Sequence, residues 1–284
     1  MNNDNPSIEA HYLNGGHCSQ WLCAIDGRSF RRVRFHAVFL AIRHPREGWI
    51  ICDTGYGAEA RFFEATRRLP FLFYRMTTPV TPRGSVASAL APLGVHPSEV
   101  RHVIITHFHA DHIGGLDEFS NARVHCHENA LAPLRALNAF AQTRAAFLPA
   151  LLPENIDVRL AAIAAEKFRV TGADAGTDAG GLPFPSFDLF GDGMLRLVEL
   201  PGHAPGHIGL EYTGCDGVRA LYCADAFWHS MQVNRGVDLP WPATALQWDI
   251  AAYRATITKL RALARAGAHR LLACHDEETQ RHVG

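Results

Sequence analysis

The feature that most constrains this chain is the stretch THFHADHIGG, residues 106–115. It places four potential metal ligands within six positions: His107, His109, Asp111 and His112. The β-branched run VII precedes it and predicts a buried strand, so these side chains would lie where that strand ends. Loops at strand ends are where a rigid scaffold presents reactive groups. With 17 histidines in the chain, single ones can be surface or capping residues, but this spacing predicts a metal site.

The spacing also predicts how the ligands divide. In an extended chain, residues two apart point to the same side, so His107 and His109 can reach one ion. Asp111 and His112 follow where the chain turns into a Gly-rich helix start, and they can face a second ion. Histidine and carboxylate ligands suit two divalent ions, with zinc expected and iron or manganese also compatible. Four ligands cannot close two sites, so others must come from elsewhere in the chain.

Strand-like and helix-like segments alternate along the rest of the sequence. Strands are predicted at 30–44, 48–52, 101–107, 194–200, 207–213, 218–223 and 269–274. Helices are predicted at 58–69, 85–93 and 243–266, and residues 171–186 are Gly-, Asp- and Pro-rich and predict a loop. We expect a layered α/β protein that forms a single domain over 1–284, with an Ala/Leu-rich helical insertion at about 128–167.

Composition argues against several functional classes. The formal charge is -1 with no basic run, so a nucleic-acid-binding face is not expected. No run approaches the roughly 20 apolar residues of a membrane span, and the polar start MNNDNPSIEAHYL lacks a signal-peptide pattern. The seven cysteines are scattered, as in a reduced compartment. We expect a cytoplasmic protein acting on a small molecule, and a homodimer is compatible with the sequence.

The histidine motif resembles the signature of the metallo-β-lactamase fold superfamily. Later motifs of that family follow in order: LPGHAPGH, LYCADAFWH and LLACHDE. The resemblance extends from IICDTG at 50–55 to the terminus and implies an αββα sandwich of two mixed sheets with helices outside. Carried over residue by residue, it implies one ion held by His107, His109 and His203. It implies a second ion held by Asp111, His112 and His275, with Asp225 bridging the two.

Neighbouring residues refine this interpretation. Asp53 in CDTG resembles the family's aspartate that supports a ligand from behind, and an ordinary turn aspartate is the alternative. His207 in GHAPGH is expected to orient its loop rather than to bind metal. One zinc β-lactamase subclass uses a cysteine at the position of Asp225, so the carboxylate argues against that subclass. Cys223 is expected to be buried.

The resemblance implies a hydrolase, since two ions about 3.5–4 Å apart can share a hydroxide that attacks an ester-like bond. Asp111 is the expected proton carrier. The chain resembles the N-acyl homoserine lactonase branch in the carboxylate at 225, the insertion and the short segment after His275. We therefore expect a lactone or related ester to be opened by the metal-bridging hydroxide. An iron-dependent redox or persulfide enzyme, a thioester or phosphodiester hydrolase, and a non-catalytic binding protein stay open as alternatives.

Two further features bear on the substrate. Many of these lactonases have a tyrosine three residues after the bridging aspartate, where its hydroxyl meets the substrate carbonyl, but this chain has Trp228. An indole N–H can donate a hydrogen bond but is no acid like a phenol, and His229 could replace it or have a surface or core role. The aromatic segment 69–82, with Phe62 and Phe63 upstream, is interpreted as a lid or acyl-chain wall, a subunit contact or core filling.

Overall fold

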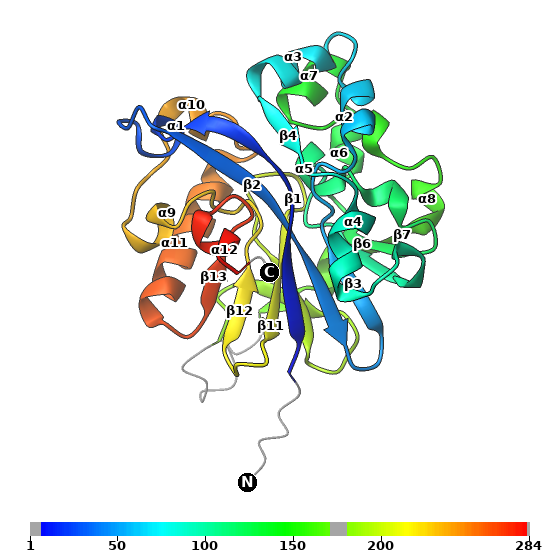
Figure 1. Ribbon diagram of the computed structural model, residues 1–284. Helices are drawn as coiled ribbons and strands as arrows, with labels where there is room; N and C mark the ends of the chain where they lie inside the picture. Colours follow the sequence, from blue (N-terminus) through cyan, green and yellow to red (C-terminus); the bar gives the residue numbers. More distant parts are fainter. Residues whose placement is uncertain (1–6, 171–180, 283–284) are drawn as a thin grey trace.

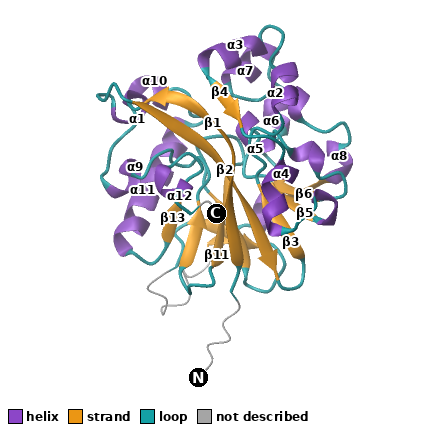
Figure 2. Ribbon diagram, viewed as in Figure 1, coloured by secondary structure: helices purple, strands orange, loops and turns teal. Residues whose placement is uncertain are grey.

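The computed structural model describes residues 7–170 and 181–282 (Figure 1). The first six residues of the polar start and most of the predicted loop, residues 171–180, lie outside the described residues. Two mixed sheets pack face to face, and helices cover their two outer faces (Figure 2). This is the predicted αββα sandwich. None of the helices described is both long enough and apolar enough to cross a membrane.

The first sheet has seven strands and combines an antiparallel half with a parallel half. Its strands, in spatial order, are β4 (Val80–Pro82), β1 (Glu9–Trp21), β2 (Arg32–His44), β3 (Gly48–Cys52), β5 (His102–Ile104), β6 (Arg123–His127) and β7 (Leu160–Ile163). The strands of the β1–β2 hairpin have 13 residues each, and β3, β5, β6 and β7 are parallel to one another. Because the ends of parallel strands share one edge, the loops after β3 and β5 lie side by side.

The second sheet has six strands, and all neighbouring pairs are antiparallel except β12 and β13. In spatial order these are β13 (Arg270–Leu272), β12 (Arg219–Tyr222), β11 (Ile208–Thr213), β10 (Leu195–Glu199), β9 (Pro185–Asp188) and β8 (Arg169–Val170). The parallel β12–β13 pair brings the loops after these two strands to the same edge, which faces the loop after β5.

The core is divided into apolar layers, and alternate side chains of β2 belong to different layers. Val38, Leu40 and Ile42 belong to the apolar layer between the sheets, whereas Phe39 and Ala41 belong to the layer under the outer helices. Successive side chains of a strand point to opposite faces, so a strand buried on both sides reads as a continuous apolar run. This explains the run HAVFLAI in the predicted strand.

Helices flank each sheet. Those on the first sheet's side are α2 (Glu59–Ala65), α3 (Phe71–Thr77), α4 (Val86–Leu90), α5 (Ala110–Ile113), α6 (Ala132–Arg135), α7 (Ala139–Arg144) and α8 (Ile156–Arg159). Those on the second sheet's side are α1 (Cys23–Asp26), α9 (Met231–Asn234), α10 (Trp241–Thr244), α11 (Ile250–Ala266) and α12 (Glu277–Gln280). Short 3-10 helices occur at Ala91–Leu93, Pro97–Glu99, Leu116–Glu118, Pro149–Leu151 and Ala165–Lys167.

Two predicted helical segments were wrong in their extent. The helix predicted from residue 243 begins at Ile250, because Asp249 caps it by accepting the Ala252 N–H, and α10 is a separate turn. The α-helices of the insertion at 128–167 end at Arg159, after which β7 pairs in parallel with β6 and a 3-10 turn follows at Ala165–Lys167. The edge of β6 offers backbone partners that outweigh the helical propensity of an Ala-rich run. That the chain forms one domain stays a prediction.

Candidate metal centre

The seven predicted ligands lie together at one end of the two sheets. They come from the loops after β5, β10, β12 and β13: His107, His109, Asp111 and His112, then His203, Asp225 and His275. The first four lie close together because the loop after β5, with His107 and His109, leads directly into α5, which carries Asp111 and His112. The loop is held by the neighbouring CDTG turn, where the Thr54 N–H donates to the His112 carbonyl at 2.9 Å.

One half of the centre is formed by His107, His109, His203 and Asp225, whose ligand atoms lie within 4.8 Å of one another. The Nε2 atom of His203 is 3.1 Å from Nδ1 of His109 and 3.3 Å from Oδ2 of Asp225. Three imidazoles and one carboxylate oxygen around a common point are a donor set that suits a zinc-like ion.

The other half is formed by Asp111, His112 and His275, and Asp225 contacts it as well. His112 Nε2 is 3.3 Å from Oδ1 of Asp225, and His275 Nε2 is 3.0 Å from its Oδ2. His275 Nε2 is also 3.6 Å from Oδ2 of Asp111. The Asp225 carboxylate therefore reaches both halves, which is the arrangement that a bridging ligand requires.

Cys274 is a further potential donor, which the predicted ligand set does not include. Its sulfur groups with Asp111 and His275, and also with His112 and Asp225. In the structure the thiol lies 3.4 Å from the Val38 carbonyl, to which it donates a hydrogen bond. Its position next to His275 was the one sequence signal for a metal-binding role, but a lone cysteine in an apolar strand run is a weak signal.

Unpaired buried atoms indicate that a cation fits this centre. Nε2 of His107, Nε2 of His112 and Oδ1 of Asp225 are buried and have no hydrogen-bond partner among the described residues. A buried polar atom without a partner costs about 1–3 kcal/mol, so three in one place need an explanation. Divalent ions held between them would satisfy all three atoms, and the residues present fit such ions.

Most of the ligand rings are held from behind through their other nitrogen. Asp53, fully buried, accepts from the Thr106 N–H at 2.9 Å and lies 2.8 Å from Nδ1 of His112. The His275 ring donates through Nδ1 to the His36 carbonyl at 2.7 Å. Such contacts fix the ring orientation and the tautomer that a metal ligand needs.

Burial and mutual charge set the protonation of the centre. Burial, reinforced by the charge on His112, holds the pKa of His107 well below its usual range. Burial opposes a charge on His112, but Asp53 and further carboxylates outweigh it and raise the pKa of His112 well above its usual range. Burial alone would raise the pKa of Asp225, yet His275 and His112 hold it well below its usual range. Metal uptake would therefore release protons.

His207 does not belong to the ligand groups but supports one of them. Its Nε2 accepts the backbone N–H of Asp225 at 3.3 Å, and burial lowers the pKa of His207 to about 3. A neutral ring that accepts the Asp225 backbone N–H is compatible with the predicted orienting role. Cys223 is fully buried and donates to the Leu221 carbonyl, away from the ligands.

A cavity of about 620 Å³ opens onto the centre. Five of the predicted ligands line it: His109, Asp111, His203, Asp225 and His275. Much of the remaining wall is apolar and comes from the β1–β2 hairpin, with Trp21, Phe30 and Phe35, and from α10 with its flanks, including Pro240 and Leu246. In Figure 1, α1 and α10 lie together beside the tip of this hairpin.

Trp228 and His229 face different hollows. The Trp228 ring lines the cavity, 5.9 Å from the His203 ring, and its indole N–H is buried without a partner among the described residues. His229 lines a neighbouring hollow of about 540 Å³, with Nδ1 3.9 Å from Oδ1 of Asp276. Both backbone N–H groups donate to the Gln232 side chain, at 2.8 and 3.2 Å.

Two buried phenols lie on the cavity wall, of which the sequence reasoning included Tyr74 only as part of the segment 69–82 and did not single out Tyr56. Tyr56 follows the CDTG turn and Tyr74 lies on α3, and burial raises the pKa of both hydroxyls well above the usual range. The aromatic segment 69–82 thus contributes Tyr74 and Thr78 to the cavity wall, while Phe73 and Met76 are exposed. Core filling does not account for those two side chains.

Comparison with known proteins identifies the family. Residues 32–266 match the model of the metallo-beta-lactamase superfamily, and the chain belongs to that superfamily. A probable metallo-hydrolase of Mycobacterium tuberculosis is 27% identical over 226 residues, 79% of this chain and 64% of the relative. This chain thus spans less than two thirds of that relative's length. The N-acyl homoserine lactonase AttM of Azorhizobium caulinodans is 31% identical over 129 residues, 44% of this chain and 40% of AttM.

Solved structures share the fold. B. thuringiensis AiiA, in a mutant with N-decanoyl-L-homoserine bound at its active site, has a TM-score of 0.68 at 16% identity. The match covers 97% of this chain and 96% of AiiA. AidC, a dizinc quorum-quenching lactonase in complex with a product, has a TM-score of 0.64 at 15% identity and covers 95% and 88% of the two chains.

Proposed function

We propose that this protein is a dinuclear metal-dependent hydrolase that opens a lactone or related ester with an apolar acyl portion. The observation that carries the proposal is the position of the predicted ligands, because five of the seven line a largely apolar cavity. The lactonase relative AttM and the dizinc lactonase AidC, which shares the fold, support it. Zinc is the metal that this donor set favours.

Divalent ions bound at the centre would lower the pKa of water and polarise the ester carbonyl oxygen. The residues supply the rest. Asp111 lines the cavity, and its Oδ2 is 3.6 Å from His275 and 3.7 Å from His112, so it can take up a proton at the reacting centre. In the overall reaction the water oxygen bonds to the acyl carbon, the ring C–O bond breaks, and the proton passes through Asp111 to the leaving alkoxide.

The apolar wall gives the acyl portion its place. Phe30 is 85% exposed and Trp21 is 45% exposed, so apolar surface in contact with water would be covered when an acyl chain binds. Burial of apolar surface contributes about 25 cal/mol per Å², and each further methylene adds about 0.8 kcal/mol where it is fully covered. A longer acyl chain is therefore expected to lower KM.

A pH-stat assay tests the proposal. Zinc-loaded protein is offered N-butanoyl and N-decanoyl homoserine lactone, and release of acid is followed with and without a chelator. Acid release that stops on chelation and has a lower KM for the decanoyl substrate is the expected result. No release from either lactone, from protein shown to contain zinc, would refute lactone opening and direct the search to thioesters and phosphodiesters.

A further inference from the structure

A glutamine outside the predicted motifs is in direct contact with a ligand. Gln247 follows α10 and is only 6% exposed. Its Oε1 lies 3.0 Å from Nδ1 of His203. Its Nε2 donates to the carbonyl of Ala243, one turn earlier, at 3.2 Å.

These two contacts fix the tautomer of His203. Because the Gln247 nitrogen faces a carbonyl oxygen, the amide oxygen faces the ring, and a carbonyl oxygen can only accept. Nδ1 of His203 must therefore carry the hydrogen, which leaves the lone pair on Nε2. That atom lies between His109 and Asp225, 3.1 and 3.3 Å away, where a metal ligand needs its lone pair.

The backbone beside Gln247 holds the same loop. The Trp248 N–H donates to the His203 carbonyl at 3.2 Å, and the Asp249 N–H donates to the Gly202 carbonyl at 2.9 Å. The fit is close: a Cβ on Gly202 would lie 2.2 Å from the backbone nitrogen of Tyr253. The LPGH loop therefore rests directly on the start of α11.

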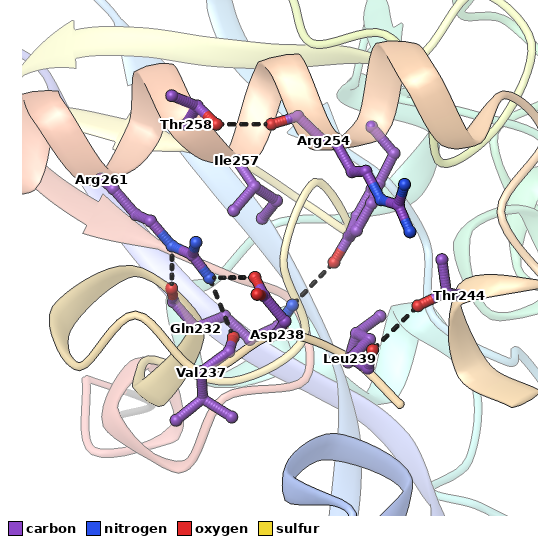
Figure 3. A pocket seen from close by; sticks show the side chains of 10 residues that line it. Gln232, Val237, Asp238, Leu239, Thr244, Arg254, Ile257, Thr258 and Arg261 are labelled. Atoms are coloured by element: carbon purple, nitrogen blue, oxygen red, sulfur yellow. Dashed lines mark hydrogen bonds and ion pairs between the residues drawn. The ribbon is translucent and has the colours of Figure 1, made fainter. Parts of the chain in front are cut away.

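The segment before Gln247 is fastened to α11 as well. Arg261 on α11 donates to the Gln232 carbonyl at 2.7 Å and to the Val237 carbonyl at 3.0 Å, and it pairs with Asp238 at 2.8 Å (Figure 3). These residues line a separate hollow of about 330 Å³ beside α11. The connection from α9 to α11 is thus a fixed support rather than a free loop.

His203 differs from the other ligand rings in where its support comes from. His112 is held by Asp53 after β3, and His275 by a carbonyl of β2, so both supports belong to the first sheet. Gln247 instead belongs to the segment whose side chains Pro242, Ala243 and Leu246 line the cavity.

We propose that Gln247 is the positioning residue of His203, holding this ring in the ligand tautomer and joining the cavity wall to the centre. The inference rests on the metal centre of the proposed function. The variant Gln247→Met removes both polar atoms at similar length. The variant Gln247→Glu also loses the donor to Ala243 but keeps an acceptor for Nδ1, so the difference between the two variants isolates the contact with His203.

The test measures zinc affinity by competition with a chromophoric chelator, together with the Tm of the metal-free protein. Gln142→Met is the matched control, since its amide donates to the Leu134 carbonyl instead. We expect Gln247→Met to bind one of two zinc ions about 10- to 100-fold more weakly. We expect Gln247→Glu to restore most of that affinity. The metal-free Tm of Gln247→Met should fall no further than that of the control.

Three results would overturn the inference. Gln247→Met could bind both ions as the wild type does, or the Met and Glu variants could be impaired equally. Wild-type protein that binds no zinc would overturn the inference and the proposed function together. Zinc binding without any lactone hydrolysis would overturn only the proposed substrate class, because the affinity measurement does not depend on turnover.

Discussion

Replacement of Gly114 by alanine should destabilise the protein and disturb the centre. Gly114 ends α5 in the HIGG stretch with φ -61° and ψ -29°, a conformation that alanine adopts freely. On that ground alone the substitution would stabilise the fold by about 0.4–1 kcal/mol, through the unfolded chain. We nevertheless expect destabilisation, because an added Cβ would lie 2.1 Å from the carbonyl oxygen of Tyr56.

The magnitude follows from that contact. Tyr56 directly follows the CDTG turn, and the obstacle is its backbone carbonyl, so the clash is relieved only if the two backbone segments separate. Overpacking costs about 1–3 kcal/mol, and this backbone clash belongs at the upper end. The bonds from Gly114 N–H to the Gly55 carbonyl and from Thr54 N–H to the His112 carbonyl, both 2.9 Å, would weaken at about 1 kcal/mol each. After the gain through the unfolded chain is subtracted, the net loss is about 4 kcal/mol.

Urea unfolding of metal-free protein measures this loss, and zinc affinity reports on the centre. Gly94→Ala is the control: its φ of +68° costs about 1–2 kcal/mol, but no atom lies within 4 Å of the added Cβ. The control should bind zinc as the wild type does, whereas Gly114→Ala should bind it more weakly. A Gly114→Ala variant that is as stable as the wild type or more so would refute the steric argument.

Three other substitutions test separate parts of the structure. Asp53→Asn should weaken zinc binding about 10- to 100-fold in chelator competition, because an amide nitrogen facing Nδ1 would favour the wrong tautomer of His112. Asp192→Asn is the control, since Asp192 pairs with His44 away from the centre, and it should leave zinc affinity unchanged. Phe30→Ser should raise KM for decanoyl more than for butanoyl lactone in the pH-stat assay, and equal changes would count against the wall. Burial lowers the pKa of His125 to about 4, so its contribution to stability, about 3 kcal/mol, is present above pH 6.5 and is lost as the pH falls towards 4. His125→Gln should flatten that part of the urea-stability profile, and an unchanged slope would refute the assignment.

Local sequence patterns were enough to predict four of the seven proposed ligands. His107, His109, Asp111 and His112 belong to one short loop-and-helix segment after an apolar strand run, so sequence spacing and spatial proximity coincide. His203, Asp225 and His275 are distant in sequence, and only the family resemblance assigned them. The structure places all seven together.

The features that were missed depend on contacts between distant residues. Gln247 is a single amide in an Ala-rich stretch, and nothing near it in sequence indicates His203. The run LAAI of β7 suits a helix as well as a strand until the edge of β6 is available. The true start of α11 did have a local signal, because Asp249 is a typical N-cap three residues before Ala252.

The predicted ligands come from both sheets, so a metal bound at the centre would link the two sheets. His107 and Asp111 follow a strand of the seven-stranded sheet, whereas His203 and His275 follow strands of the six-stranded sheet. The apolar layer between the sheets is non-directional and tolerates a small slide, but metal ligation tolerates only about 0.2 Å in each distance. Substitutions deep in that layer should therefore reveal themselves first as lost metal rather than as lost fold. Metal retention would then be the sensitive measure of how far this interior can be redesigned.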